Sequence, residues 1–327
     1  TSQVRNAGHI RNRGYEIQLG AVPIQTSKGF RWNLDLNYGA NSSKVVKLDD
    51  EGLITSYQLY SSGIQILASV GEAYGTLFGT SYVRDANGNV VVDANGLPKI
   101  STTNKTLGKF TPDWTGGISN TFSYRSLSLS FLIDASVGGS IFSNTNKTGK
   151  YTGVLANTLS GRDAEHGGLW YYTAAMGNNV RLPESPSYSV SSDGLYYAQV
   201  NGQSTRVYQD GIMVEGVTES GSKNEEVVSA EKYYHRIYSI AEANVYDASY
   251  VKLREVALSY RLPRLWTQKL HLQEASVTLT GRNLWTIYKS VPNIDPESAL
   301  TTGNAQGVEA YSLPTTRSFG VNLSVKF

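Results

Sequence analysis

Large apolar residues occupy every second position in several stretches of this chain, with small or polar residues between them. One such stretch carries Leu127, Leu129, Phe131, Ile133, Ala135 and Val137. Since successive side chains of a β-strand point to opposite faces, a period of two predicts strands with one apolar and one polar face. The pattern predicts seven long strands, at about residues 13–23, 30–41, 114–125, 127–138, 250–262, 273–285 and 317–327.

The alternation changes phase within the fifth predicted strand. Val251 and Leu253 stand at odd positions, whereas Val256 and Leu258 stand at even positions. One extra residue in a strand reverses the faces of everything that follows it. We therefore expect a β-bulge near Arg254–Glu255.

The length of these strands bears on the class of β protein. Eleven residues that rise about 3.3 Å each and tilt by about 40° span about 28 Å, and a barrel in the outer membrane presents an apolar band about 25 Å tall. Strands of ordinary globular proteins are mostly about 5–6 residues long. Aromatic residues near the strand ends, such as Trp32, Tyr124 and Trp285, suit the interfacial girdles of a membrane barrel. The pattern favours an all-β, antiparallel transmembrane β-barrel. A large soluble barrel or sandwich with the apolar face as its core is the alternative.

The connections between the predicted strands alternate between short and very long. Short connections fall near residues 25–29, at Arg125–Ser126 and from Pro263 to Leu272, and the long ones cover 42–113, 141–249 and 287–316. In outer-membrane barrels the short turns face the periplasm and the long loops face outward. We therefore expect the long loops to be extracellular. Within them, Asp85–Asn89 carries an Asn-Gly hairpin signal and 225–240 has the spacing of one short helix.

The charge balance and the absence of cysteine exclude several kinds of partner and site. With 29 Lys and Arg against 27 Asp and Glu, the net charge of +2 gives no reason to expect a nucleic-acid partner. The chain has no cysteine, which excludes disulfides, Cys-ligated zinc and Fe–S clusters. Asp163, Glu165 and His166 form its only acid–histidine cluster, in a stretch typical of a solvated loop. We expect no catalytic residues, no metal and no cofactor.

Aromatic residues gather in the longest connection. Trp170, Tyr171 and Tyr172 are consecutive, and Tyr196 and Tyr197 follow. Aromatic faces with hydroxyl edges suit sugars or extended peptides, so these five residues are candidates for contact with a substrate or a partner protein. The alternative is that they pack the loops against one another. Since a disordered segment would be poor in aromatic residues, we expect 141–249 to be folded.

Several segments resemble SusC/RagA-type TonB-dependent outer-membrane transporters. In chain order they are residues 6–16 (NAGHIRNRGYE), 82–88 (YVRDANG), 248–256 (ASYVKLREV), 281–284 (GRNL) and 295–297 (DPE). They stand in the order found in that family. The last residue is an aromatic, Phe327, as is usual in outer-membrane barrels.

The resemblance implies a place in the outer membrane of a Gram-negative bacterium. Members of the family combine an N-terminal extension, a plug domain and a 22-stranded barrel. This chain would supply about seven C-terminal strands of that barrel, with the plug and N-terminal domains absent from it.

The resemblance also implies a function and partners. The function is TonB-dependent import of oligosaccharides or oligopeptides. The partners are a SusD-like lipoprotein over the extracellular mouth, the TonB complex, the remainder of the transporter and outer-membrane lipid. It further implies that Phe327 is read during barrel assembly. The alternatives from the residues themselves are a passive porin or adhesin and a soluble glycan-binding β protein.

Overall fold

The computed structural model describes residues 8–327, and strands dominate it. The prediction of an all-β chain is confirmed. Of the segments that resemble the transporter family, the first begins at Asn6 and Ala7, which lie outside the described residues. None of the helices in residues 8–327 is long and apolar enough to span a membrane.

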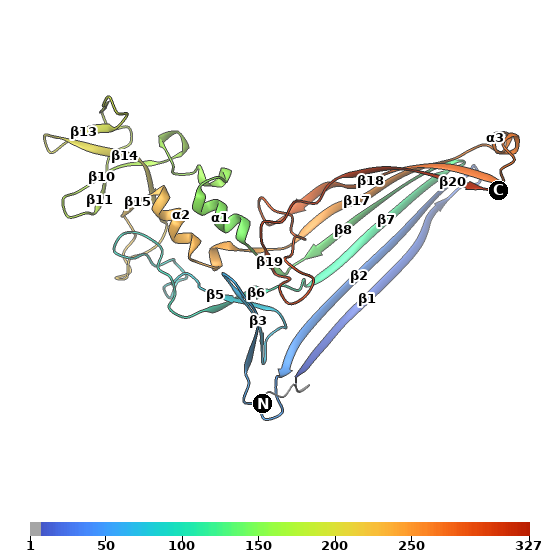
Figure 1. The fold of residues 1–327 in the computed structure, drawn as a ribbon, viewed down its shortest axis with the longest axis horizontal. Coiled ribbons are helices and arrows are strands. Elements are labelled where there is room, and N and C mark those ends of the chain that lie inside the picture. Colours follow the sequence, from blue (N-terminus) through green and yellow to red (C-terminus); the bar gives the residue numbers. More distant parts are fainter. Residues whose placement is uncertain (1–7) are drawn as a thin grey trace, which may run out of the picture.

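One large antiparallel sheet forms the body of the structure (Figure 1). Its seven strands, in spatial order, are β1 (His9–Gln25), β2 (Phe30–Lys47), β7 (Trp114–Tyr124), β8 (Leu127–Val137), β17 (Tyr250–Arg261), β18 (Glu274–Lys289) and β20 (Ser318–Lys326). Each strand expected from the alternation overlaps one of these. β1 and β2 run beyond the apolar alternation because backbone pairing continues through polar residues, for example between Arg11 and Lys44.

The predicted bulge is confirmed. The register of β17 shifts between Leu253 and Glu255 against both of its neighbours, β8 and β18. Arg254 is therefore the extra residue. Because of it, Arg254 and Glu255 both lie on the polar side of the sheet, while Leu253 and Val256 lie on the apolar side.

The register sorts the side chains of the sheet into two faces, which we call the apolar face and the polar face. One row across the apolar face consists of Leu19, Leu36, Ile118, Ile133, Leu253 and Trp285. One row across the polar face consists of Arg31, Ser123, Ser128, Ser259, Thr278 and Asn322. Much of the apolar face is left uncovered by the described residues, since Leu19, Ile118 and Val321 are 60%, 42% and 74% exposed.

The three long connections are folded. The first contains β3 (Ser56–Ser61), β4 (Gln65–Ser69), β5 (Thr76–Gly79) and β6 (Lys105–Lys109). The second contains β9 (Ser140–Ser143), α1 (Asn144–Thr152), η1 (Ala156–Thr158), η2 (Ala164–His166), β10 (Leu169–Thr173), β11 (Asn179–Arg181), β12 (Tyr188–Val190), β13 (Tyr196–Val200), β14 (Gln203–Met213), β15 (Val227–Ser229), α2 (Ala230–Tyr238), η3 (Glu242–Asn244) and β16 (Val245–Asp247). The third contains β19 (Val308–Glu309). The expected hairpin at Asp85–Asn89 is present, closed by a bridge between Arg84 and Val90, and α2 lies within the expected helical segment.

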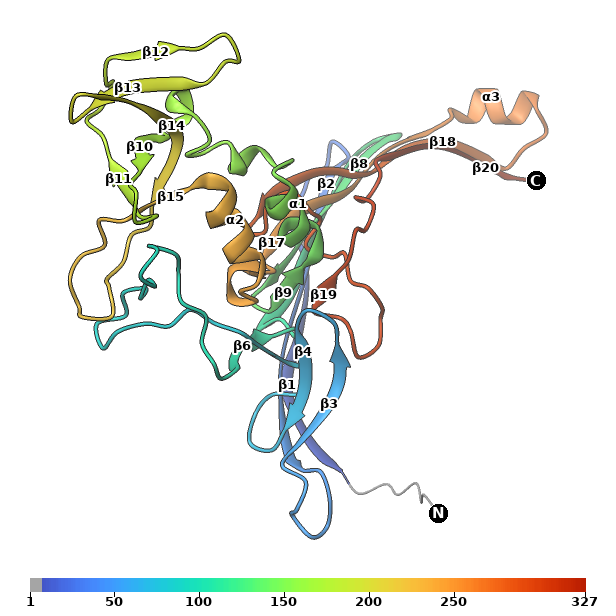
Figure 2. The same cartoon turned by 60° about the vertical axis from the view of Figure 1, so that its left-hand side comes forward.

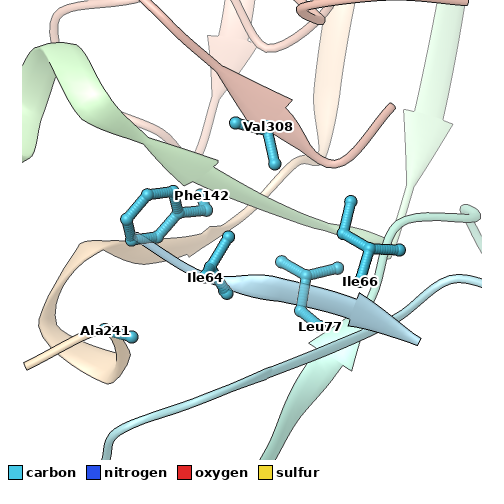
Figure 3. Close-up of a cluster of buried hydrophobic side chains, with 6 residues drawn as sticks. All are labelled: Ile64, Ile66, Leu77, Phe142, Ala241 and Val308. Atoms are coloured by element: carbon cyan, nitrogen blue, oxygen red, sulfur yellow. The ribbon is translucent and has the colours of Figure 1, made fainter. Parts of the chain in front are cut away.

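These three connections share one hydrophobic core (Figure 3). The buried members are Ile64, Ile66 and Leu77 of the first connection, Phe142 and Ala241 of the second and Val308 of the third. We call residues 48–113, 138–249 and 290–317 together the loop assembly. It lies at one end of the large sheet, as both views show (Figures 1 and 2).

A buried glutamate gives the loop assembly a second link. Glu309, which has no exposed surface, accepts hydrogen bonds from Ser143 Oγ at 2.7 Å and Thr145 Oγ1 at 2.6 Å. Ser143 is also the N-cap of α1, since its side chain accepts from the backbone N–H of Asn146. The third connection thus holds the start of a helix in the second.

At the opposite end of the sheet the connections are short. β7 and β8 are joined by Arg125–Ser126, and Arg125 has a φ of 53°. The connection between β17 and β18 holds a helix that the sequence pattern did not predict, α3 (Arg264–Lys269), which begins directly after Pro263.

The two faces of the sheet predict opposite responses to a charge placed on one strand. Ile118→Arg puts a guanidinium on the apolar face near the middle of β7, and Ser119→Arg puts the same group on the polar face. If the apolar face meets lipid, Ile118→Arg should cost about 2–4 kcal/mol of folding free energy. Ser119→Arg should change it little. Urea unfolding of the bilayer-embedded protein measures both, and equal effects would contradict this assignment of the faces.

Candidate functional site

The six-stranded sheet of the loop assembly carries all five aromatic residues singled out in the sequence. It comprises β10 to β15 and lies at the far side of the loop assembly from the large sheet (Figure 2). Trp170 of β10 is 7% exposed and packs with Ala198 and Val207. The Trp170 ring stacks on Tyr188 with ring centroids 4.9 Å apart, and it meets the edge of Tyr196 at 5.5 Å. Tyr172 packs against the same cluster.

The opposite face of this small sheet carries a second aromatic row. The Tyr171 ring stacks on Tyr208 at 5.2 Å, and its hydroxyl donates to Asp210 Oδ1 at 3.1 Å. Burial, with the nearby Asp210 carboxylate, raises the pKa of Tyr171, and burial also raises the pKa of Asp210. Tyr197 pairs with Arg206 across β13 and β14, and the Arg206 guanidinium lies 4.9 Å from the centroid of the Tyr208 ring.

The exposed fractions of the five aromatic candidates show which of them could contact another molecule. Trp170 and Tyr171 are 7% and 4% exposed, so contacts within the chain already occupy their rings. Tyr172, Tyr196 and Tyr197 are partly exposed. The small sheet therefore uses Trp170 and Tyr171 as packing, and it presents Tyr197 together with Arg206 to the outside.

Sequence reasoning missed Tyr188, Arg206, Tyr208 and Asp210. The last three alternate with Val207 and Gln209 along β14, so a period of two was available as a signal. Tyr188 lies in a Ser-, Gly- and Pro-rich stretch and carried no periodic signal.

A cavity of about 740 Å³ opens between the first and second long connections. Its lining includes Tyr82 of the first connection and Lys150, Tyr233 and Tyr234 of the second. Lys150 Nζ donates to the carbonyl oxygen of Ala243 at 2.7 Å, and burial lowers the pKa of Lys150 to about 8. Aromatic rings, hydroxyls and an amine in one hollow suit an oligomeric ligand with apolar faces and polar edges.

A group of charged residues lies where the polar face meets the loop assembly. Lys252 of β17 is 4% exposed, and its Nζ lies 2.6 Å from Asp295 Oδ1 and 2.5 Å from Glu297 Oε2. Arg254 pairs with Asp134 of β8 at 2.6 Å and also with Glu297. We call these five residues the ion cluster. It joins two segments that resembled the transporter family separately, ASYVKLREV and DPE.

The surroundings of the two carboxylates that the third connection supplies to the ion cluster, Asp295 and Glu297, lower the pKa of both. Burial alone would raise the pKa of Asp295 and of Glu297, but hydrogen bonds from Lys252, Thr315 and Arg254 outweigh it, so both pKa values are lowered. A carboxyl group whose pKa is lowered by folding stabilises the folded state at pH values above its ordinary pKa of about 4. The ion cluster therefore holds the third connection at neutral pH, and it weakens only as the pH falls through the lowered pKa values.

The remaining polar candidates have structural partners. The Asp163 carboxylate caps a short turn by accepting from the backbone N–H of His166 at 2.9 Å. The Asp85 carboxylate accepts from the backbone N–H groups of Asn87 and Asn89 in its hairpin. Within residues 8–327, no group of three or more His, Asp or Glu side chains is placed to hold a metal ion.

Comparison with known proteins finds chains that are similar to this one along its whole length. No protein-family model matches the chain. A curated relative from Formosa agariphila, TonB-dependent receptor P3, is 26% identical over 100% of this chain and 30% of its own length. TonB-dependent receptor P26 of the same organism is 25% identical over the same shares. Two solved structures also match over 30% of their own chains.

The first of these is the RagAB peptide transporter, with a TM-score of 0.57 and 20% identity over 100% of this chain. The second is the RagAB peptide importer in its closed-closed state, with a TM-score of 0.56 and 18% identity over 99% of this chain. At such identities the match shows the fold. The resemblance to SusC/RagA-type TonB-dependent receptors is confirmed. This receptor-like chain spans about 30% of the length of the relatives that it matches.

The ion cluster of this receptor-like chain predicts a large effect of removing one charge. Lys252→Met leaves Asp295 buried without its cation, and breaking a buried pair in this way costs about 3–5 kcal/mol. Hydrogen exchange of residues 295–315 should accelerate accordingly. Lys252→Met combined with Asp295→Asn should recover much of the loss, because both charges are then gone.

Lys289→Met is the matched control on the neighbouring strand. Lys289 is exposed, and its Nζ donates to the carbonyl oxygen of Ile294 at 2.7 Å. This variant should have a small effect. Similar exchange rates in Lys252→Met and Lys289→Met would show that the ion cluster does not anchor the third connection.

Proposed function

We propose that this chain forms part of the wall of an outer-membrane β-barrel that imports oligosaccharides or oligopeptides with energy delivered through TonB. The observation that carries the proposal is the uncovered apolar face, which crosses all seven strands of the large sheet. In water such a face would drive aggregation, whereas in a bilayer it would contact the apolar acyl chains. The polar face then lines the interior of the barrel.

The edges of the sheet support a barrel completed by the remainder of a receptor. β1 and β20 stand at the two ends of the strand order, so each pairs on one side within the described residues. Unpaired backbone groups on long edge strands are not tolerated in hydrocarbon. The proposal therefore requires further strands, outside this chain, to pair with β1 and β20. Phe327 follows β20 directly and is 85% exposed, and its role in assembly stays a prediction.

The loop assembly is the extracellular part in this proposal. Its cavity and the pair of Tyr197, which is partly exposed, and Arg206, which is exposed, are the candidate surfaces for cargo and for a SusD-like lipoprotein. The RagAB structures are described as a peptide transporter and importer, which favours an oligopeptide cargo. An oligosaccharide fits the same aromatic and polar lining.

The alternative functions differ from active import in the structural features that they require. A soluble glycan-binding protein would need its apolar face buried, which the described residues do not do. A passive porin or adhesin would have the same wall but no need of a lipoprotein or of TonB. Catalysis is not part of the proposal, and the named relatives are receptors and transporters.

Uptake by cells that carry the full receptor tests the proposed function. Uptake of labelled oligopeptide or oligosaccharide should stop when a protonophore collapses the inner-membrane gradient, because release into the periplasm needs TonB. Uptake that persists would support a passive porin instead and would overturn active import.

A second arm of this experiment tests the outer surface of the small sheet. Tyr197→Ala with Arg206→Ala should weaken binding of the lipoprotein about thirtyfold, the equivalent of about 2 kcal/mol for an interface anchor. Met176→Ala, in the turn between β10 and β11 and 95% exposed, is the control and should change nothing. Wild-type binding and uptake in the double variant at normal expression would mean that this surface contacts neither partner nor cargo.

A further inference from the structure

The short helix between β17 and β18 has a composition that its place in a turn does not require. α3 (Arg264–Lys269) lies at the end of the large sheet opposite the loop assembly (Figures 1 and 2). It carries Leu265 and Trp266 together with Arg264 and Lys269, and Leu270 is its C-cap. A simple turn would be served by small polar residues.

The large apolar side chains of α3 face away from the protein. Leu265, Trp266 and Leu270 are 73%, 58% and 62% exposed, whereas Thr267 is 2% exposed. At about 100° per residue, Leu265 and Lys269 lie about 160° around the helix from Thr267, and Trp266 lies about 100° from it. The helix thus packs through its small residue and presents its large ones.

The exposed side of α3 continues the apolar face of the large sheet. α3 packs against β18, where Ala275 of the apolar face is only 3% exposed. Other apolar-face residues at the same end remain open, among them Tyr260 at 42% and Leu323 at 64%. Apolar side chains of the sheet and of α3 are therefore exposed together at this end of the structure.

The charges of α3 complement a phosphate-bearing surface. Arg261 pairs with Glu274 at 2.9 Å, but Arg264 and Lys269 have no ion-pair partner within residues 8–327. Lysine and arginine at the edge of an apolar band extend their charged ends toward lipid headgroups, and tryptophan favours the same depth. Apolar side chains with flanking cations are the composition of an interfacial helix.

We propose that α3 is a lipid anchor at the rim of the barrel. Leu265, Trp266 and Leu270 insert among the headgroups and the ends of the acyl chains, and Arg264 and Lys269 bind lipid phosphate. The anchor fixes the depth and tilt of β17 and β18 in the bilayer. This inference rests on the proposed function, because it needs the apolar face of the large sheet to lie in a membrane.

A fluorescent reporter at single introduced cysteines tests the anchor in the full receptor. The receptor is placed in phosphatidylcholine vesicles with and without phosphatidylglycerol, and a nitroxide near the lipid headgroup serves as quencher. Quenching should be several-fold stronger at Leu265→Cys than at Met176→Cys, which is 95% exposed in the loop assembly. Arg264→Gln with Lys269→Gln should weaken quenching in the phosphatidylglycerol vesicles, and Arg264→Lys with Lys269→Arg should preserve it.

A third reporter, Val321→Cys on the apolar face, separates failure of the anchor from failure of the proposed function. If Val321→Cys is quenched by lipid while Leu265→Cys is quenched only by iodide in the water, the anchor is wrong and the membrane barrel stands. If neither site is quenched by lipid, the barrel itself is wrong. If Leu265→Cys is shielded from both quenchers in cells alone, a protein covers α3 and the lipid proposal is overturned.

Discussion

The register of the seven long strands is the constraint on which the rest of the structure depends. It places Leu36, Ile118 and Ile133 side by side, and it places polar residues on the reverse of the same strands. Because side chains alternate, a slip of one residue in any strand would move its apolar set to the polar face. The bulge at Arg254 keeps Leu253 and Val256 on one face while the intervening charges lie on the other.

A sheet with one face reserved for hydrocarbon limits where the other residues can lie. The long connections gather at one end and bury Ile66, Phe142 and Val308 in a core of their own. They are tied to the polar face by the ion cluster, where the segments ASYVKLREV and DPE meet. The stability of the loop assembly thus comes from apolar packing within it and from charges at its junction with the sheet.

The large sheet could be predicted because its strands obey a local rule, the period of two. The bulge followed from the same rule, since a phase change near Arg254 is visible in the sequence alone. The loop assembly could not be predicted in this way, because its core joins residues as distant as Ile66 and Val308. The aromatic run at Trp170 shows the same limit: the sequence marks it as notable, and only the fold shows that the indole is packed inside. α3 was missed because six residues are too few to show helical periodicity.

The contact of the apolar face with lipid is the central claim, and spin labels at two adjacent residues of β8 test it most directly. Leu129 lies on the apolar face and Ser130 on the polar face. In the full receptor in a bilayer, the label at residue 129 should collide mainly with oxygen dissolved in lipid. The label at residue 130 should collide mainly with a water-soluble nickel complex, because it faces the interior of the barrel. Equal accessibility at the two sites, or the reverse order, would contradict the account.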